Sequence, residues 1–215
     1  MPQKDDFLTR LQEQVQRTLE AARGLHRAGQ TDEALATLHD AQRSIVGLDA
    51  DLLRRIGSAD LLLLLGGPGT PDTEKCLQCA ELLSAAVELR ADRGETDPAG
   101  AQKALDLYLS AVAAEPGFAP HYEGRLGTLT RSLDYAVPPR TQEGLVAAYT
   151  HAGRFDEAEN WLYRLLDAEP EAAQAGAEAF YRKLLGLSDA ALERGGLPRG
   201  EVEEGLANVT RRAPA

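Results

Sequence analysis

Residues 139–170 carry two amphipathic patterns joined by a glycine turn, and this feature constrains the fold most strongly. Before the turn, Leu145, Val146 and Tyr149 fall on one face of a helix. After Gly153 a second helical face follows, formed by Ala158, Trp161, Leu162 and Leu165. Two helices joined by so short a turn must pack face to face, so the segment predicts an antiparallel helix pair.

The composition extends this prediction to the whole chain. Ala, Leu and Glu are plentiful, β-branched residues are scarce, and only 5% of the residues are aromatic. Such a composition favours helix over strand. With 215 residues, 43% of them hydrophobic, the chain is long enough to bury a core. We therefore predict an all-α protein in a single domain, residues 1–215.

The N-terminal part predicts another helix pair, with a first helix over about 5–28. Its apolar residues recur every three or four positions, namely Leu8, Leu11, Val15, Leu19, Ala22 and Leu25. Gly29 ends this helix, and Thr31 is the expected N-cap of a second one that reaches about Ile45.

The middle of the chain predicts two short helices and then another pair. The short helices are expected over 49–56 and 58–65, and the five consecutive leucines 61–65 suit a segment buried between neighbouring helices. Residues 66–71, GGPGTP, should form an exposed loop. A long helix over 72–93 and a partner over 101–114 follow.

The remaining segments predict one single helix and one more pair. Pro120 can begin a helix whose apolar stripe is Tyr122, Leu126, Leu129 and Leu133. One more helix pair is expected over 172–185 and 198–212, and its last helix would cover the exposed end of a helical stack.

The second helices of the pairs share a pattern. Each begins with a small residue, Ala34, Ala104 or Ala158, followed four positions later by a larger one, and proline closes the last two units. This pattern resembles the tetratricopeptide repeat (TPR), in a bacterial type of protein. The turns AGQTDEA, 28–34, and AGRFDEA, 152–158, are the most specific part of the resemblance, which covers 18–45 and 142–170 well and 82–116 partly.

The resemblance implies antiparallel helix pairs stacked as a TPR-like superhelix, an α-α solenoid, which is irregular because the alanines are unevenly spaced. Repeat-like units would lie near 8–48, 73–116 and 140–170, with covering helices over 171–212. First helices of the units would line a groove that holds a protein or peptide. The implied groove positions are Arg23, His26, Arg140, Glu143, Ala147 and Thr150. The lysine and asparagine set with which some family members grip a C-terminal carboxylate is missing, so no such clamp is expected.

A basic face on the first helix offers a further candidate surface. Arg17, Arg23, His26 and Arg27 form the densest basic face of an otherwise acidic chain. It is either a solvated helix face or a site for an acidic partner segment.

Other chemistries fit the sequence poorly. The loop after the leucine run imitates a phosphate-binding loop, but Pro71 and Asp72 stand where the second glycine and the lysine are needed, and an aspartate would repel the phosphates. Cys76 and Cys79 lack a second cysteine pair for zinc, which leaves a regulatory disulfide or two packed apolar side chains. The histidines show no metal or catalytic spacing. We expect no catalytic residue, no cofactor, no metal and no enzyme activity.

The net charge of the chain disfavours some classes of binding partner. A net charge of −11 and an isoelectric point of about 4.9 disfavour nucleic acid and anionic membranes. No signal segment or membrane span is evident, so a soluble, cytoplasmic protein is expected. We predict a scaffold for a protein or peptide partner, with a homodimer through the first helix as an option. The alternative is a ligand-binding regulatory domain that recognises a small molecule in the groove.

Overall fold

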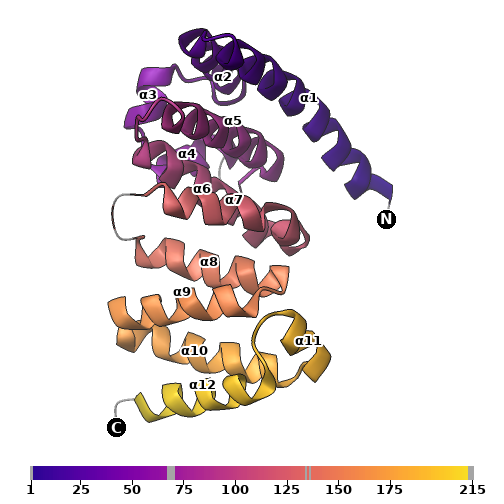
Figure 1. Ribbon diagram of the computed structural model, residues 1–215, viewed down its shortest axis with the longest axis vertical. Helices are drawn as coiled ribbons and strands as arrows, with labels where there is room; N and C mark the ends of the chain where they lie inside the picture. Colours follow the sequence, from indigo (N-terminus) through magenta and orange to yellow (C-terminus); the bar gives the residue numbers. More distant parts are fainter. Residues whose placement is uncertain (1, 67–70, 134, 136, 213–215) are drawn as a thin grey trace. The chain divides into compact units, whose positions relative to one another are not determined.

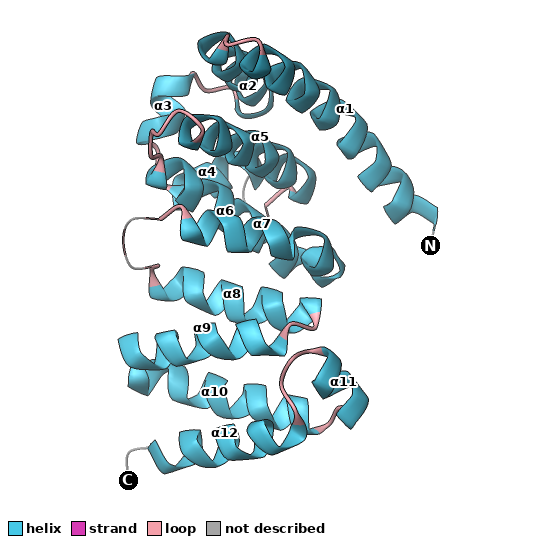
Figure 2. Cartoon of the chain, viewed as in Figure 1, coloured by secondary structure: helices cyan, strands magenta, loops and turns pink. Residues whose placement is uncertain are grey.

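The computed structural model describes residues 2–66, 71–133, 135 and 137–212, without the side chains of 2–12, 14, 50 and 212. Within these ranges the chain is built from helices and turns and contains no strand, so the all-α prediction is confirmed (Figure 2). The residues group into two compact units: unit 1 is Met1–Glu115 with Gly124–Ala136, and unit 2 is Pro116–Glu123 with Val137–Ala215.

Unit 1 contains the predicted N-terminal and middle helix pairs (Figure 1). Its helices are α1 (Pro2–Arg27), α2 (Thr31–Val46), α3 (Ala50–Arg55), α4 (Ser58–Gly66), α5 (Thr73–Ala91) and α6 (Pro98–Ala114). A short 3-10 helix, η1 (Pro116–Phe118), precedes α7 (Ala119–Arg131). Residues 124–131 of α7 group with unit 1, and residues 119–123 group with unit 2.

The α1–α2 pair forms as predicted, with one correction at its turn. Gly29 adopts a φ of +80°, which L side chains rarely adopt, and this ends α1. The predicted N-cap, Thr31, is wrong: it is the first residue of α2, and Gln30 occupies the cap position without a side-chain cap. Instead, the Thr31 hydroxyl lies 2.9 Å from His26 Nδ1. The side chains of Leu8 and Leu11, part of the predicted stripe, lie outside the described residues.

Helix α5 is the centre of unit 1. It contacts α1, α2, α4 and α6, and its buried residues include both cysteines and the polar Ser84. A helix that is apolar on most faces needs neighbours on most faces, which α5 has.

The prediction of a leucine run that is buried all round is wrong. Leu61 and Leu65 are fully buried, whereas Leu63 is 66% exposed and Leu64 is 55% exposed. Helix α4 rests one face on α5 and α6, which buries Leu61 and Leu65, four positions apart, and leaves Leu63 and Leu64 on the opposite side in solvent. The predicted loop after it falls mostly on 67–70, outside the described residues.

Unit 2 contains the helix pair at 139–170 and the C-terminal helices. These are α8 (Pro139–Ala152), α9 (Phe155–Ala168), α10 (Pro170–Leu185), α11 (Asp189–Arg194) and α12 (Arg199–Arg212). Helices α8, α9, α10 and α12 lie side by side in this order, each in contact with the next (Figure 1). Gly153, with a φ of +74°, makes the turn between α8 and α9. The predicted pair is therefore confirmed.

The small residues of the second helices are buried as their pattern predicts. Ala34, Ala104 and Ala158 are all fully buried. Without a larger side chain, each lets its helix approach a neighbour closely.

Helix α11 was not predicted. Ser188 caps it, because its hydroxyl accepts a hydrogen bond from the amide of Ala191 at 3.3 Å. The turn after it reaches back to α9: the carbonyl of Gly195 accepts from the amides of Phe155 at 2.8 Å and Asp156 at 3.1 Å. The start of α9 is thus capped by backbone from the C-terminal region.

Candidate functional site

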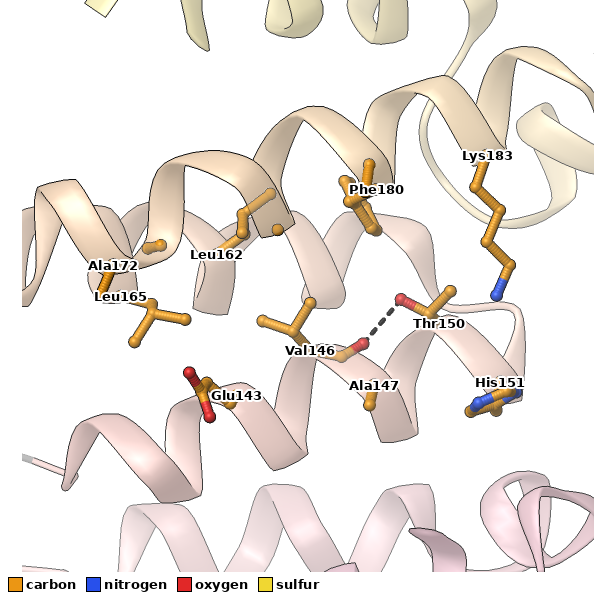
Figure 3. Close-up of a pocket in the computed structure, with 13 residues that line it drawn as sticks. Glu143, Val146, Ala147, Thr150, His151, Leu162, Leu165, Ala172, Phe180 and Lys183 are labelled. Carbon is orange, nitrogen blue, oxygen red and sulfur yellow. Dashed lines mark hydrogen bonds between the residues drawn. The ribbon is translucent and has the colours of Figure 1, made fainter. Parts of the chain in front are cut away.

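A pocket of about 390 Å³ opens between α8, α9 and α10 of unit 2 (Figure 3). Most of its wall is apolar and comes from Val146, Ala147, Leu162, Leu165, Ala172, Ala173, Gly176, Ala179 and Phe180. Its polar residues are Glu143, Thr150, His151 and Lys183. The volume and the lining are typical of a site that takes up apolar groups and orients them with a few polar ones.

The pocket exists because α10 presents small residues to it. Ala172, Gly176 and Ala179 are spaced by four and three residues, so they share one helix face. A Cβ added at Gly176 would have no heavy atom within 4 Å. The partly exposed Val146 opposite therefore meets open space where a side chain of α10 would otherwise pack.

The two ends of the pocket differ in charge. Glu143 lies at one end, beside Leu165, and Lys183 and His151 lie at the other (Figure 3). Burial, and then the charge of Lys183, lower the pKa of His151, which favours its neutral form. In the described part of the chain, no carboxylate forms an ion pair with Lys183. Its ammonium group is therefore available to a ligand.

The hydroxyl of Thr150 already donates its proton in a hydrogen bond within α8. Its Oγ1 donates to the carbonyl of Val146, four residues earlier, at 2.6 Å (Figure 3). A hydroxyl that donates to its own helix still has a lone pair, so Thr150 can accept a hydrogen bond from a ligand.

The pocket brings together part of the predicted groove. Glu143, Ala147 and Thr150 line it, whereas Arg140 is exposed in the first turn of α8 and does not. Sequence reasoning missed the contribution of α10. The available signal was the spacing of Ala172, Gly176 and Ala179, which indicates a shared small-residue face.

The predicted positions on α1 lie in unit 1 and take no part in this pocket. Arg23 is half-buried and Arg27 is exposed, and Arg27 Nε donates to the carbonyl of Arg23 at 3.3 Å. Both ring nitrogens of His26 face groups of unit 1, since Nδ1 lies near Thr31 and Nε2 lies 3.4 Å from Asp92. His26 therefore links α1 to the end of α5.

Cys76 and Cys79 are both fully buried. Burial raises the pKa of Cys76 to about 11 and that of Cys79 to about 12. Both thiols are thus protonated at neutral pH, as expected for packed apolar side chains. Within the described ranges, no three His, Cys, Asp or Glu residues are placed to hold a metal ion. Over the same residues, every helix is too short or too polar to cross a membrane.

Comparison with known protein families gives a match over nearly the whole chain. Residues 3–213 match a family described as "Family of unknown function (DUF6483)". Neither a curated protein nor a solved structure matches the chain. Because the match covers nearly the whole sequence, the chain belongs to the family of unknown function DUF6483.

Proposed function

We propose that this protein is a non-enzymatic, TPR-like scaffold that binds a segment of a partner protein in the pocket of unit 2. In this proposal, α8 with α9 and α10 with α12 are two consecutive helix pairs, and the remaining pairs continue an irregular TPR-like superhelix. Helices α8 and α10 are then the first helices of neighbouring pairs. The pocket lies between them, where a TPR-like protein would hold its partner.

The observation that carries the proposal is the apolar hollow with oppositely charged ends. An apolar side chain of the partner would enter between Val146 and Phe180 and displace water from an apolar wall. Lys183 would attract an acidic group of the partner, and Glu143 a basic one. The expected partner segment therefore has an apolar anchor between an acidic and a basic residue.

Filling the pocket tests this proposal. In Gly176→Leu, a side chain occupies the hollow, and the helix itself gains from losing glycine. Peptides are first selected on the wild-type protein from a random library, and their Kd is then measured by fluorescence polarisation. We expect binding at least about 10-fold weaker to Gly176→Leu, a loss of about 1.4 kcal/mol.

The matched control is Gly200→Leu, where an added Cβ also meets open space but lies on α12, away from the pocket. It should bind the selected peptides like the wild type. Charge reversal at Lys183 and Glu143 should invert the preferred direction of the acidic and basic residues. Equal binding to Gly176→Leu, or selection of no peptide, would refute the proposal.

A small apolar molecule is the second candidate occupant, because the pocket volume falls in the range of small-molecule sites, about 300–1,000 Å³. A thermal-shift screen with metabolites separates the two. A ligand at 100 times its Kd stabilises the protein by about 2.7 kcal/mol. The small-molecule function requires that Gly176→Leu abolish this stabilisation.

Part of the apolar stripe of α1 is not available for the proposed homodimer. Val15, Leu19 and Ala22, which belong to the apolar stripe of α1, are buried within unit 1, where α1 contacts α2 and α5. Sedimentation velocity over a wide concentration range tests the dimer, and a constant monomer would exclude it.

A further inference from the structure

A smaller pocket of about 90 Å³ lies inside unit 1, between α2, α3, α5 and α6. Unlike the pocket of unit 2, it is lined by many polar side chains. These are His39, Gln42, Arg54, Arg90, Asp97 and Lys103. They come from segments far apart in the sequence, so the pocket is a product of the helix packing.

Gln42 is the most informative residue of this pocket. It is only 1% exposed, and neither Nε2 nor Oε1 has a hydrogen-bond partner among the residues that the structure describes. Rotating the amide by half a turn would exchange the two atoms and leave both unpaired. A buried amide without partners is costly, and a group that both accepts a hydrogen bond and donates one would satisfy it.

Lys103 adds a buried positive charge. It is 6% exposed, and its Nζ donates to the backbone carbonyl of Arg54 at 2.9 Å. No carboxylate among the described residues forms an ion pair with it. Burial lowers the pKa of Lys103 more than the charge of Asp97 raises it, so the ammonium group is only partly compensated. An anion beside it would supply a close counter-ion.

Asp97, the carboxylate that lines this pocket, is already engaged. Its Oδ2 accepts from Arg90 at 2.7 Å, and its Oδ1 accepts from the amide of Gly100 at 2.9 Å. Arg90 Nη2 lies 3.4 Å from His39 Nε2. The pKa of His39 is lowered by burial first and by Arg90 next, so the imidazole is neutral at neutral pH. Arg90 and Lys103 therefore outweigh Asp97 in charge.

We propose that this pocket binds a small free oxyanion that carries a hydroxyl, such as hydrogen phosphate. Lys103 Nζ and Gln42 Nε2 would donate to oxygens of the anion, and the anion's hydroxyl would donate to Gln42 Oε1. The volume suits a single tetrahedral ion and excludes a nucleotide or a larger phosphate ester. The site is separate from the pocket of unit 2, so it stands whether or not a partner binds there.

Thermal melts of the full chain in phosphate, sulfate and chloride, at matched ionic strength and pH, test the proposal. We expect phosphate to raise Tm in a saturable way, by about 5 °C or more at 100 times its Kd. Sulfate should raise Tm less, because it has no hydroxyl for Gln42 at neutral pH. Titration calorimetry with inorganic phosphate gives the Kd.

Two variants and a control localise the effect. Lys103→Met and Gln42→Leu should each weaken phosphate binding by about 10-fold or more, because each loses a hydrogen bond to a charged group. Lys75→Met removes a half-exposed lysine of the same unit and should bind phosphate like the wild type.

Phosphate-free buffer provides a check on folding. Gln42→Leu should melt no lower than the wild type there, because it replaces an unpaired amide with an apolar group of similar size. Three results would overturn the proposal. Phosphate could raise Tm no more than chloride does, sulfate could raise it as much as phosphate does, or both variants could bind phosphate as tightly as the wild type.

Discussion

The carboxylate of Asp97 lies 2.7 Å from the guanidinium of Arg90. This ion pair joins the last turn of α5 to the N-cap of α6. Both side chains are mostly buried, with exposed fractions of 20% and 15%. Asp97→Asn keeps a good cap but leaves the Arg90 charge unpaired, so we expect a loss of about 2–3 kcal/mol. Asp97→Ala should cost about 1 kcal/mol more, because it also removes the cap. Urea denaturation measures both.

The exposed pair of Arg43 and Asp40 on α2 is the control for this prediction. Their atoms are 3.4 Å apart, and both side chains are more than half exposed. Asp40→Asn should change the free energy of unfolding by less than about 0.5 kcal/mol. A similar loss at both positions would mean that burial does not set the strength of the Asp97 pair.

Gly205 allows α12 to approach α10. A Cβ at this position would lie 2.3 Å from Cε1 of Tyr181, a ring that is fully buried. Gly205→Ala should therefore destabilise the protein by about 1–3 kcal/mol, although alanine is the better helix former. Gly200→Ala, on the same helix but with open space around the added Cβ, should be neutral or stabilising by up to about 1 kcal/mol. Thermal or urea unfolding of the two variants checks the contrast.

Glu159 should make stability depend on pH. It accepts a hydrogen bond from the Tyr181 hydroxyl at 2.6 Å. Burial nevertheless raises its pKa above the ordinary value of 4.5, more than the Tyr181 hydrogen bond lowers it. Between 4.5 and the raised pKa, the folded state holds more protons than the unfolded state, so the Glu159 contribution to stability falls as pH rises through this window.

Glu159→Gln removes this titration. The free energy of unfolding of the variant, minus that of the wild type, should be largest at neutral pH. This difference should decrease as pH falls through the same window. The change should stay below about 1 kcal/mol, because solvent screens a half-buried carboxylate. Melting curves of both proteins between neutral and mildly acid pH measure it. A difference in Tm that does not vary with pH would contradict the assignment.

The cysteines should be unreactive while the protein is folded. Cys76 and Cys79 are fully buried, and their pKa values are raised to about 11 and about 12. Since the thiolate is the reactive form, a thiol reagent at neutral pH should label them only after unfolding. Rapid labelling of native protein would refute this prediction and restore the regulatory-disulfide hypothesis. Labelling kinetics with and without denaturant decide between them.

The sequence predicts the helix pairs because their signals are local. Glycine is favoured where φ is positive, and both Gly29 and Gly153 occupy such a position at a predicted turn. The apolar stripes likewise depend only on spacing along one helix, so Leu145 and Tyr149 are buried as predicted. Helix α11 is too short at six residues to show a period, so only its N-cap Ser188 could have indicated it, as Asp49 does for the equally short α3.

The pockets depend on what faces each helix, which spacing alone does not reveal. A row such as Ala172, Gly176 and Ala179 suits close packing and an open hollow equally well, and the side chains opposite decide between them. The same holds for Gln42 and Lys103, which meet only after α2 and α6 pack around α5. Exposure of Leu63 was missed for the same reason, since one-sided packing of α4 is a property of its neighbours.

The carbonyl of Gly195, which accepts from the first two amides of α9, has a consequence for how unit 2 is made. During synthesis, α8 and α9 leave the ribosome well before Gly195 does. The first two amides of α9 therefore lack this hydrogen-bond acceptor until a residue from beyond α10 has been made. In a chain that stops after α10, the start of α9 should fray at Phe155. The C-terminal region thus completes the helix pair that precedes it.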